Sequence, residues 1–371
     1  MIELITTIGL LSAVMYLLIL LYLIIGIIRT KTELTDEQPF VSVIVAAHNE
    51  DQNIKACLDA LLNQDYSQGK MEIIIVNDRS EDDTGLIVNK YEKNNTLIRV
   101  LTISDCVLGL SPKKNALTHG INIANGEIIA VTDADCRAPI QWLKRGVSYF
   151  TPETGMVVGL APLNPTSWWM SPLMCLDAIV GGITAYGSLG WNHAVTCTGR
   201  NLFYRKKLFE EIGGFSGIDH ILMGDDDLLM MKIRKQTNWK IRFMPDGNSA
   251  VLSDAPTGWR QFVSQRSRHI SASKYFPFSV KAGFGITFIS KLFIILFVFV
   301  LLVGNGTSHL NIALIIILPY LATFLLLIMM SIKVRQASNI LFYPLWEIYY
   351  LFNQLMIGPL GFFGQITWGK K

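Results

Sequence analysis

Two aspartates stand directly after a short apolar run and have the spacing of a metal site. Asp133 and Asp135 follow the run 128–131 and are separated by one alanine. Alternate residues of an extended segment point the same way, so both carboxylates can face one ligand. Mg²⁺ and Mn²⁺ bind carboxylate and phosphate oxygens together. The pair therefore predicts a site for a divalent metal and a diphosphate, although a polar turn after a strand would account for the same residues.

Two further acids, Glu50 and Asp78, stand at the ends of two earlier apolar runs. Carboxylates there can accept hydrogen bonds from a nucleotide base or from ribose hydroxyls. Helix caps and first-turn acids are the alternative use of such residues. Lys113 and Lys114 follow a Gly/Pro loop, and we expect Lys114 to contact a phosphate of the bound nucleotide. A solvated pair of lysines is the other interpretation.

Three consecutive acids precede another apolar run. They are Asp225, Asp226 and Asp227, followed by 228–231. Crowding can raise the pKa of one carboxylate, which suits a general base that takes a proton from an acceptor hydroxyl. A helix N-terminus, where acids are favourable, would also explain the triplet.

A basic cluster follows within residues 259–269, where Gln265, Arg266, Arg268 and His269 are grouped. Such a cluster could stabilise a leaving diphosphate. It could equally bind anionic lipid headgroups at a membrane surface.

Alternating strand-like and helix-like segments must position these residues. Short apolar runs typical of buried strands occupy 41–45, 73–76, 97–101 and 128–131. Helical patterns lie between them, at 54–62, after Asp83 and at 113–124. This alternation predicts an α/β fold with a mainly parallel sheet covered by helices. Ligands of such sheets bind at the carboxyl ends of the strands, where the acids stand.

The apolar residues are concentrated at the two ends of the chain, which is 51% hydrophobic and 16% charged. Residues 5–28 are long enough to cross a hydrocarbon core of about 30 Å. Arg29 and Lys31 follow at once, which predicts that the chain after this anchor is cytoplasmic. Three further apolar stretches predict about three C-terminal transmembrane helices, at 284–304, 310–330 and 340–363. The last contains prolines and polar residues, so a broken or interfacial helix is the alternative.

These segments divide the chain into three parts: an N-terminal anchor at 1–31, a cytoplasmic catalytic domain with interfacial segments at 32–282, and C-terminal membrane helices at 283–371. We expect an integral protein of the bacterial inner membrane or an equivalent membrane. Trp168 and Trp169 predict either a membrane-surface segment or core packing.

Charge and cysteine usage exclude other classes. The net charge is +3, without a basic arm interleaved with aromatics, so we expect no nucleic-acid partner. The five cysteines are scattered and form no C-x-x-C pair, which argues against a zinc cage or a disulfide framework.

Six short motifs occur in one order along the chain. They are V-S-V-I-V-A-A-H-N-E at 41–50, N-D-R-S at 77–80, T-D-A-D at 132–135, T-G-R-N at 198–201 with G-G-F at 213–215, G-D-D-D at 224–227 and Q-R-S-R-H at 265–269. Together they resemble the motifs of family 2 glycosyltransferases, in the membrane-integrated branch with cellulose, chitin and ceramide-glucosyl synthases. The resemblance runs from about Pro39 to Arg268.

The resemblance implies a GT-A fold, a nucleotide-sugar donor that we expect to be a UDP-sugar, and inversion at the anomeric carbon. It implies that Asp226 is the general base, by its register to Met231-Lys232-Ile233, which looks like the family's L-R-L. The remaining implied roles are nucleotide binding by Glu50 and Asp78, diphosphate and metal (Mg²⁺ or Mn²⁺) binding by Asp133 and Asp135, and the family's Q-x-x-R at Gln265 and Arg268.

Two departures from the family motifs bear on the product. The family's T-E-D is here Gly224-Asp225-Asp226, and the tryptophan of its Q-x-x-R-W is here His269. That tryptophan lies at the acceptor sugar in processive synthases. Its absence favours transfer of one sugar to a lipid or glycolipid. A processive polysaccharide synthase and a non-catalytic membrane protein with a degenerate transferase domain are the competing hypotheses.

Overall fold

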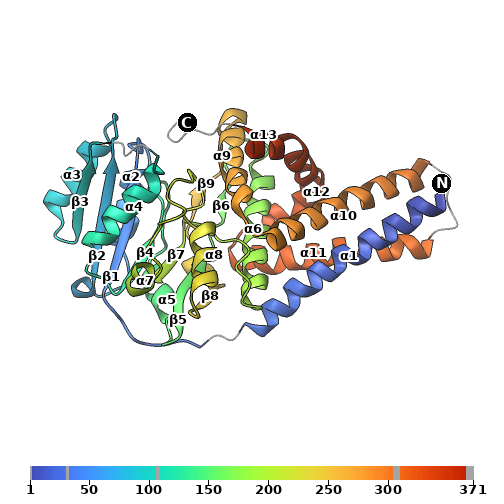
Figure 1. Cartoon of the computed structure of the whole chain (residues 1–371). Coiled ribbons are helices and arrows are strands. Elements are labelled where there is room, and N and C mark those ends of the chain that lie inside the picture. Colours follow the sequence, from blue (N-terminus) through green and yellow to red (C-terminus); the bar gives the residue numbers. More distant parts are fainter. Residues whose placement is uncertain (1, 31–32, 106–108, 304–309, 365–371) are drawn as a thin grey trace.

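The computed structural model describes residues 2–30, 33–105, 109–303 and 310–364 of the 371-residue chain. Figure 1 shows an α/β domain joined to an elongated bundle of long helices. Helix α1 (Ile2–Arg29) runs through the bundle toward the domain. Lys31, of the predicted positive flank, lies outside the described residues.

The domain is built on a mixed sheet with strand order β3-β2-β1-β4-β7-β5-β8. The predicted strands are confirmed as β1, β2, β3 and β4, which all run parallel. Strand β7 runs antiparallel to both of its neighbours, β4 and β5. The strands are β1 (Val41–Ala47), β2 (Met71–Asp78), β3 (Ile98–Ile103), β4 (Ile128–Val131), β5 (Thr154–Gly159), β7 (Leu202–Arg205) and β8 (Lys240–Met244). A small two-stranded sheet pairs β6 (Leu163–Asn164) with β9 (Ser253–Asp254).

The central strands are apolar throughout because helices cover both faces of the sheet. Side chains alternate between two cores: Val43 and Val45 of β1 enter one, and Ile44 enters the other. The first core contains α2 (Ile54–Leu62), α3 (Thr84–Asn94) and α5 (Trp142–Ser148). The second contains α4 (Pro112–Ile123), α6 (Ser171–Leu189), α7 (Lys206–Glu211) and α8 (Asp227–Gln236), and continues into the helix bundle.

Helix α6 joins the sheet to the bundle. Tyr186 of α6 stacks on Phe243 of β8 at 4.9 Å between ring centroids. On its other side α6 crosses α1 where Gly26 meets Gly187 and Gly190, and a Cβ on Gly26 or Gly190 would collide with backbone across the contact. Glycines therefore allow the anchor to approach the domain at backbone distance.

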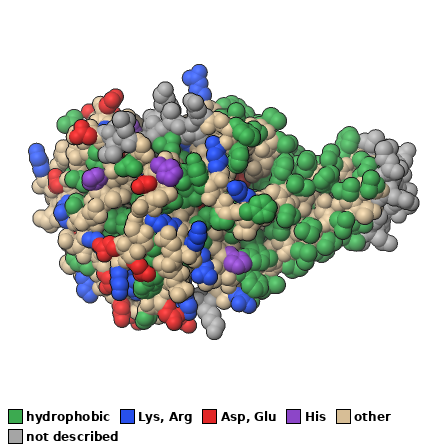
Figure 2. Space-filling view, viewed as in Figure 1, with side chains coloured by type: hydrophobic (Ala, Val, Ile, Leu, Met, Phe, Trp, Pro, Cys, Tyr) green, Lys and Arg blue, Asp and Glu red, His purple; other side chains and the backbone are tan. Residues whose placement is uncertain are grey.

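Within the described residues, four helical segments are long and apolar enough to cross a membrane: Leu4–Arg29, Ser171–Leu189, Phe278–Val300 and Ile315–Lys333. The last two belong to α10 (Phe278–Val303) and α11 (Leu310–Lys333), near the predicted spans. Figure 2 shows hydrophobic side chains covering the elongated bundle, with the charged residues concentrated on the domain. The segment within α6 was not predicted as a candidate, and it is the most buried of the four within the protein.

The stretch 340–363 is a broken helix, which was the alternative to an unbroken transmembrane span. It contains a 3₁₀ turn at Ala337–Phe342, α12 (Tyr343–Phe352), a π-helical turn at Asn353–Ile357 and α13 (Gly358–Phe363). Gly361 of α13 packs closely on Ile270 and Ser267 of α9 (Trp259–Ala272). The C-terminal helices therefore support the helix that carries the Q-x-x-R motif.

A buried ion pair ties α12 to the bundle. The Lys291 ammonium of α10 lies 2.5 Å from the Glu347 carboxylate. Aromatic rings from α1, α11 and α12 surround the ammonium at centroid distances of 4.8 Å for Tyr16, 5.9 Å for Tyr320, 4.7 Å for Trp346 and 4.9 Å for Tyr350.

Candidate active site

The sheet brings the predicted donor acids to one edge. Strands β1, β2 and β4 are neighbours, and Glu50, Asp78 and Asp133 follow or end them on the same side. The loops after β1 and β2 are tied together, since the Asn49 N–H donates to the Ser80 hydroxyl at 3.1 Å. The Glu50 N–H donates to the Thr84 hydroxyl at 2.7 Å.

Lys113 joins the two acid motifs. Its ammonium, at the start of α4, lies 2.8 Å from Asp133 Oδ1 and 2.8 Å from Asp225 Oδ2. Burial alone would lower the pKa of Lys113, but these carboxylates hold it well above its usual value. Residues 92 positions apart in the chain therefore form one cluster around a single cation.

The acid triplet lies at the start of α8, as the helix-terminus interpretation predicted. Asp226 accepts hydrogen bonds from the Gly199 N–H at 2.8 Å and from the Asp227 N–H at 2.7 Å. Asp227 accepts one from the Cys197 N–H at 2.7 Å. Burial raises the pKa of Asp227, and the neighbouring Asp226 raises it further. Helix capping and carboxylate crowding thus occur together.

Gly199 lies against the centre of this cluster. A Cβ at Gly199 would lie 3.2 Å from Asp225 Oδ2 and 3.4 Å from Lys113 Nζ. A larger side chain would crowd the carboxylates, so the glycine of T-G-R-N lets the backbone approach them.

Asp133 and Asp135 fit a divalent metal. Their oxygens and the Cys136 sulfur lie within 4.8 Å of one another. Burial raises the pKa of Asp135, and the charges of Asp133 and Glu50 raise it further, so a bound cation would relieve repulsion. Burial also raises the pKa of the Cys136 thiol well above its usual value, which keeps it protonated. Carboxylate oxygens suit Mg²⁺ or Mn²⁺, whereas a protonated thiol does not.

Two arginines interact electrostatically with the metal acids. Burial lowers the pKa of Arg268 on α9, while Asp135, Glu50 and Asp133 oppose that shift, so its charge acts on theirs. Gln265 is half-buried three residues earlier on the same helix. Arg200 also interacts electrostatically with Asp133 and Asp135. This interaction was not predicted, because the sequence showed Arg200 only as part of the T-G-R-N motif.

Lys114 is placed differently from Lys113. Its ammonium is buried and donates to three backbone carbonyls: Ile218 at 2.8 Å, Ile221 at 2.5 Å and Met223 at 2.9 Å. It therefore holds the segment that leads into the acid triplet. The geometry favours Lys113 as the lysine that meets donor phosphate.

The two nucleotide acids also have partners. Asp78 is buried and accepts two hydrogen bonds from the Arg79 guanidinium, at 2.7 and 3.0 Å. Glu50 accepts one from the Asn53 amide at 2.8 Å. These contacts fix both carboxylates at the edge of the site.

The two tryptophans before α6 differ in their packing and exposure. Trp168 packs on Trp259 and Phe262 at 5.5 and 5.8 Å between ring centroids. Trp169 is 67% exposed. One ring is therefore packed against the core and the other is open to a surface.

Models of known protein families match most of the chain. A model described as "Glycosyl transferase family group 2" matches residues 128–334, and one described as "Glycosyl transferase family 2" matches residues 42–213. The probable glycosyltransferase YdaM of Bacillus subtilis is 29% identical over 253 residues, covering 67% of this chain and 58% of that protein. The beta-monoglucosyldiacylglycerol synthase of Trichormus variabilis is 28% identical over 238 residues, covering 62% and 49%. The chain thus spans about half the length of the curated relatives it matches.

A solved structure gives the same fold. The mannosyltransferase PcManGT of Pyrobaculum calidifontis, in complex with GDP-Man and Mn²⁺, superposes with a TM-score of 0.59 at 19% identity, covering 93% of this chain and 99% of that one. The predicted GT-A fold and family are confirmed. The chain belongs to glycosyltransferase family 2.

Proposed function

We propose that this chain is an inverting enzyme that moves one sugar from a nucleotide-sugar to a lipid or glycolipid acceptor at the cytoplasmic membrane face. The observation that carries the proposal is the convergence of Asp133 and Asp225 on Lys113. It brings the motif for the donor diphosphate and the motif for the acceptor proton into one site.

The donor half of the site rests on the strand-end acids. Glu50 and Asp78 bind the nucleoside, which we expect to be uridine, and Asp133 and Asp135 hold a divalent metal. When bound, the metal neutralises the diphosphate and makes it a better leaving group. Lys113, Arg268 and Gln265 supply further donors to the phosphates. The structural neighbour solved in complex with GDP-Man and Mn²⁺ supports a nucleotide-sugar donor and a divalent metal.

The acceptor half rests on Asp226. Two backbone N–H groups orient its carboxylate, from Gly199 and Asp227. As the acceptor oxygen bonds to the anomeric carbon, its proton passes to Asp226. The bond between that carbon and the diphosphate oxygen breaks on the opposite face, which inverts the configuration.

A membrane acceptor is supported by the surroundings of the site. Exposed aromatic side chains occur on α9, at Trp259, and on segments near it, at Trp169, Phe278 and Phe363. Such residues favour the headgroup level of a membrane. The synthases of monoglucosyldiacylglycerol among the relatives make a diacylglycerol-type lipid a reasonable acceptor.

The test is to incubate membranes containing the protein with a panel of labelled nucleotide-sugars, then to extract the lipids and analyse them by mass spectrometry. We expect one sugar on an extractable lipid. A long water-soluble polymer would establish the processive alternative, and no product with any donor would support the non-catalytic one. An engineered cysteine at exposed Glu37 should resist an impermeant reagent in intact cells, and its labelling would refute the cytoplasmic orientation.

A further inference from the structure

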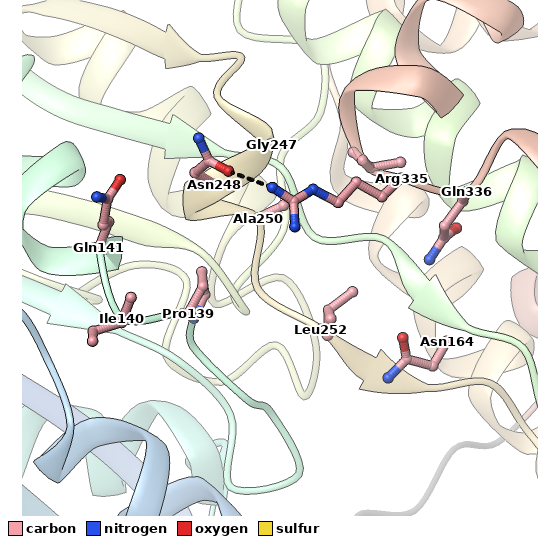
Figure 3. A pocket seen from close by; sticks show the side chains of 11 residues that line it. Pro139, Ile140, Gln141, Asn164, Gly247, Asn248, Ala250, Leu252, Arg335 and Gln336 are labelled. Atoms are coloured by element: carbon pink, nitrogen blue, oxygen red, sulfur yellow. Dashed lines mark hydrogen bonds between the residues drawn. The ribbon is translucent and has the colours of Figure 1, made fainter.

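A cavity of about 540 Å³ lies where the end of α11 meets the α/β domain. Figure 3 shows Arg335 and Gln336, which follow α11, on one side of it, with Asn248, Gln141 and Asn164 from the domain around the rest. The acids of the candidate active site do not line it. The cavity is therefore separate from the site assigned to sugar transfer.

The lining carries one positive charge and no acid. Two acids on adjoining segments are each paired with an arginine: Asp254 with Arg137, and Asp246 with Arg145 at 3.1 Å. Within the described ranges no carboxylate lies at ion-pair distance from Arg335, whose guanidinium donates only to the Asn248 amide oxygen at 3.2 Å. Arg335 is exposed where it lines the cavity, and a guanidinium there without a carboxylate partner can pair with an anionic ligand.

The backbone holds Arg335 in place at a conformational cost. The Gln336 N–H donates to Ser331 O at 2.8 Å and the Arg335 N–H to Ile332 O at 3.1 Å, which is a Schellman end to α11. Arg335 occupies the position where glycine is usual, with φ of 59°. A use for its side chain would explain why arginine stands there, since Lys333 already places a cation at this helix end.

The position of the cavity relative to the membrane suggests where the anion comes from. Segment Ile315–Lys333 is long and apolar enough to span a membrane, so Lys333 marks the headgroup level on the domain side. We propose that the cavity binds the phosphodiester headgroup of an anionic membrane phospholipid. Arg335 pairs with the phosphate, and the amides of Asn248 and Gln141 bond to the headgroup hydroxyls.

The site adjoins the segment that carries the metal acids. Arg137, two residues after Asp135, pairs through its backbone with Leu252, which lines the cavity. A lipid bound there would stabilise this segment as well as the domain–bundle junction.

The test measures thermal unfolding of the purified full-length protein in detergent, with short-chain phosphatidylglycerol or with phosphatidylcholine of the same chain length. We expect phosphatidylglycerol to raise the Tm by about 3 °C more than phosphatidylcholine does. Arg335→Gly removes the guanidinium and suits the left-handed backbone, so it should fold normally and lose that difference. Lys333→Gln, at the same helix end but outside the cavity lining, should keep it.

Equal shifts with the two lipids would overturn the proposal, as would an Arg335→Gly protein that still prefers phosphatidylglycerol. Inorganic phosphate at the same concentration should give little shift. If it reproduced the whole effect, the ligand would be free phosphate and the lipid assignment would be wrong. The assay does not use sugar transfer, so its outcome is independent of the proposed function.

Discussion

Two ion-paired lysines, one in each half of the molecule, differ in the balance of charge around them. Lys113 lies 2.8 Å from both Asp133 and Asp225, and Asp226 is also close enough to shift its pKa. Among the described residues, Lys291 pairs with one acid, Glu347, at 2.5 Å, and aromatic rings enclose the rest of its ammonium. The first cluster has more acids than bases, and the second is balanced one to one.

The excess of acids around Lys113 suits a site that binds a cationic ligand. The balanced pair of Lys291 and Glu347 suits a contact that stabilises helix packing. Excess carboxylates repel one another until a cation or a cation-bound diphosphate joins them. A balanced pair in an apolar surround needs nothing further, but the loss of either member leaves a buried charge alone.

Chelation should have the largest effect on transfer and none on the bundle. We expect EDTA to abolish sugar transfer, because Asp133 and Asp135 cannot face a diphosphate without a metal between them, and Mn²⁺ or Mg²⁺ to restore it. Label in the lipid extract measures activity. Full activity of an Asp135→Asn enzyme in EDTA would refute the metal site.

Breaking the balanced pair should reduce stability. Lys291→Met leaves Glu347 buried and unpaired, which we expect to cost about 3–5 kcal/mol and to lower the Tm in detergent. The double variant Lys291→Met with Glu347→Leu should recover most of that loss. A double variant as unstable as the single one would mean that the aromatic surround, and not the pair, holds α12.

Removing the proposed base should reduce turnover without changing donor affinity. We expect Asp226→Asn to lower transfer by about 10²-fold or more, since the amide cannot accept the acceptor proton. Kinetics at varied donor concentration measure both quantities. Asp227→Asn, one position along the same helix, is the matched control. If it were inactive while Asp226→Asn kept full activity, the base would be the neighbouring acid.

The smallest effect is expected at the exposed tryptophan. Trp169→Ala should raise the KM for the lipid acceptor by about fivefold, the loss of about 1 kcal/mol of aromatic contact with the headgroup region. Hydrolysis of the nucleotide-sugar by water should be unchanged. Trp168→Ala should instead lower the Tm, because that ring packs on Trp259 and Phe262. Equal loss of transfer and hydrolysis in Trp169→Ala would make that ring structural.

The sequence predicted the part of the fold that depends on local pattern. Strands β1 to β4 were predicted because each is a short apolar run followed by a polar loop, and the strand-end acids followed from them. Helix α6 was missed, since Asp177 and paired glycines interrupt its apolar pattern. Its length is explained only by the packing of α1 and β8 on its two sides.

The sequence predicted that the strand-end acids would lie near one another, but it did not show which partners the lysines and Arg200 would have. Lys113 and Lys114 are adjacent in the sequence, and only the fold shows that one faces Asp133 while the other binds carbonyls of 218–223. Arg200 is held by Ala161 O at 2.6 Å and the Ser253 hydroxyl at 2.7 Å, partners about 40 and 50 residues away in the chain. Contacts between such distant segments leave no periodic signal.

The most direct measurement follows both products of the purified protein in lipid vesicles supplied with Mn²⁺ and its nucleotide-sugar. Nucleoside diphosphate released into solution is compared with sugar recovered in the organic phase. We expect one sugar per acceptor lipid, equal to the diphosphate released, and no release in EDTA. Release of many diphosphates per acceptor chain, with sugar in an aqueous polymer, would contradict it, as would the absence of release with every nucleotide-sugar.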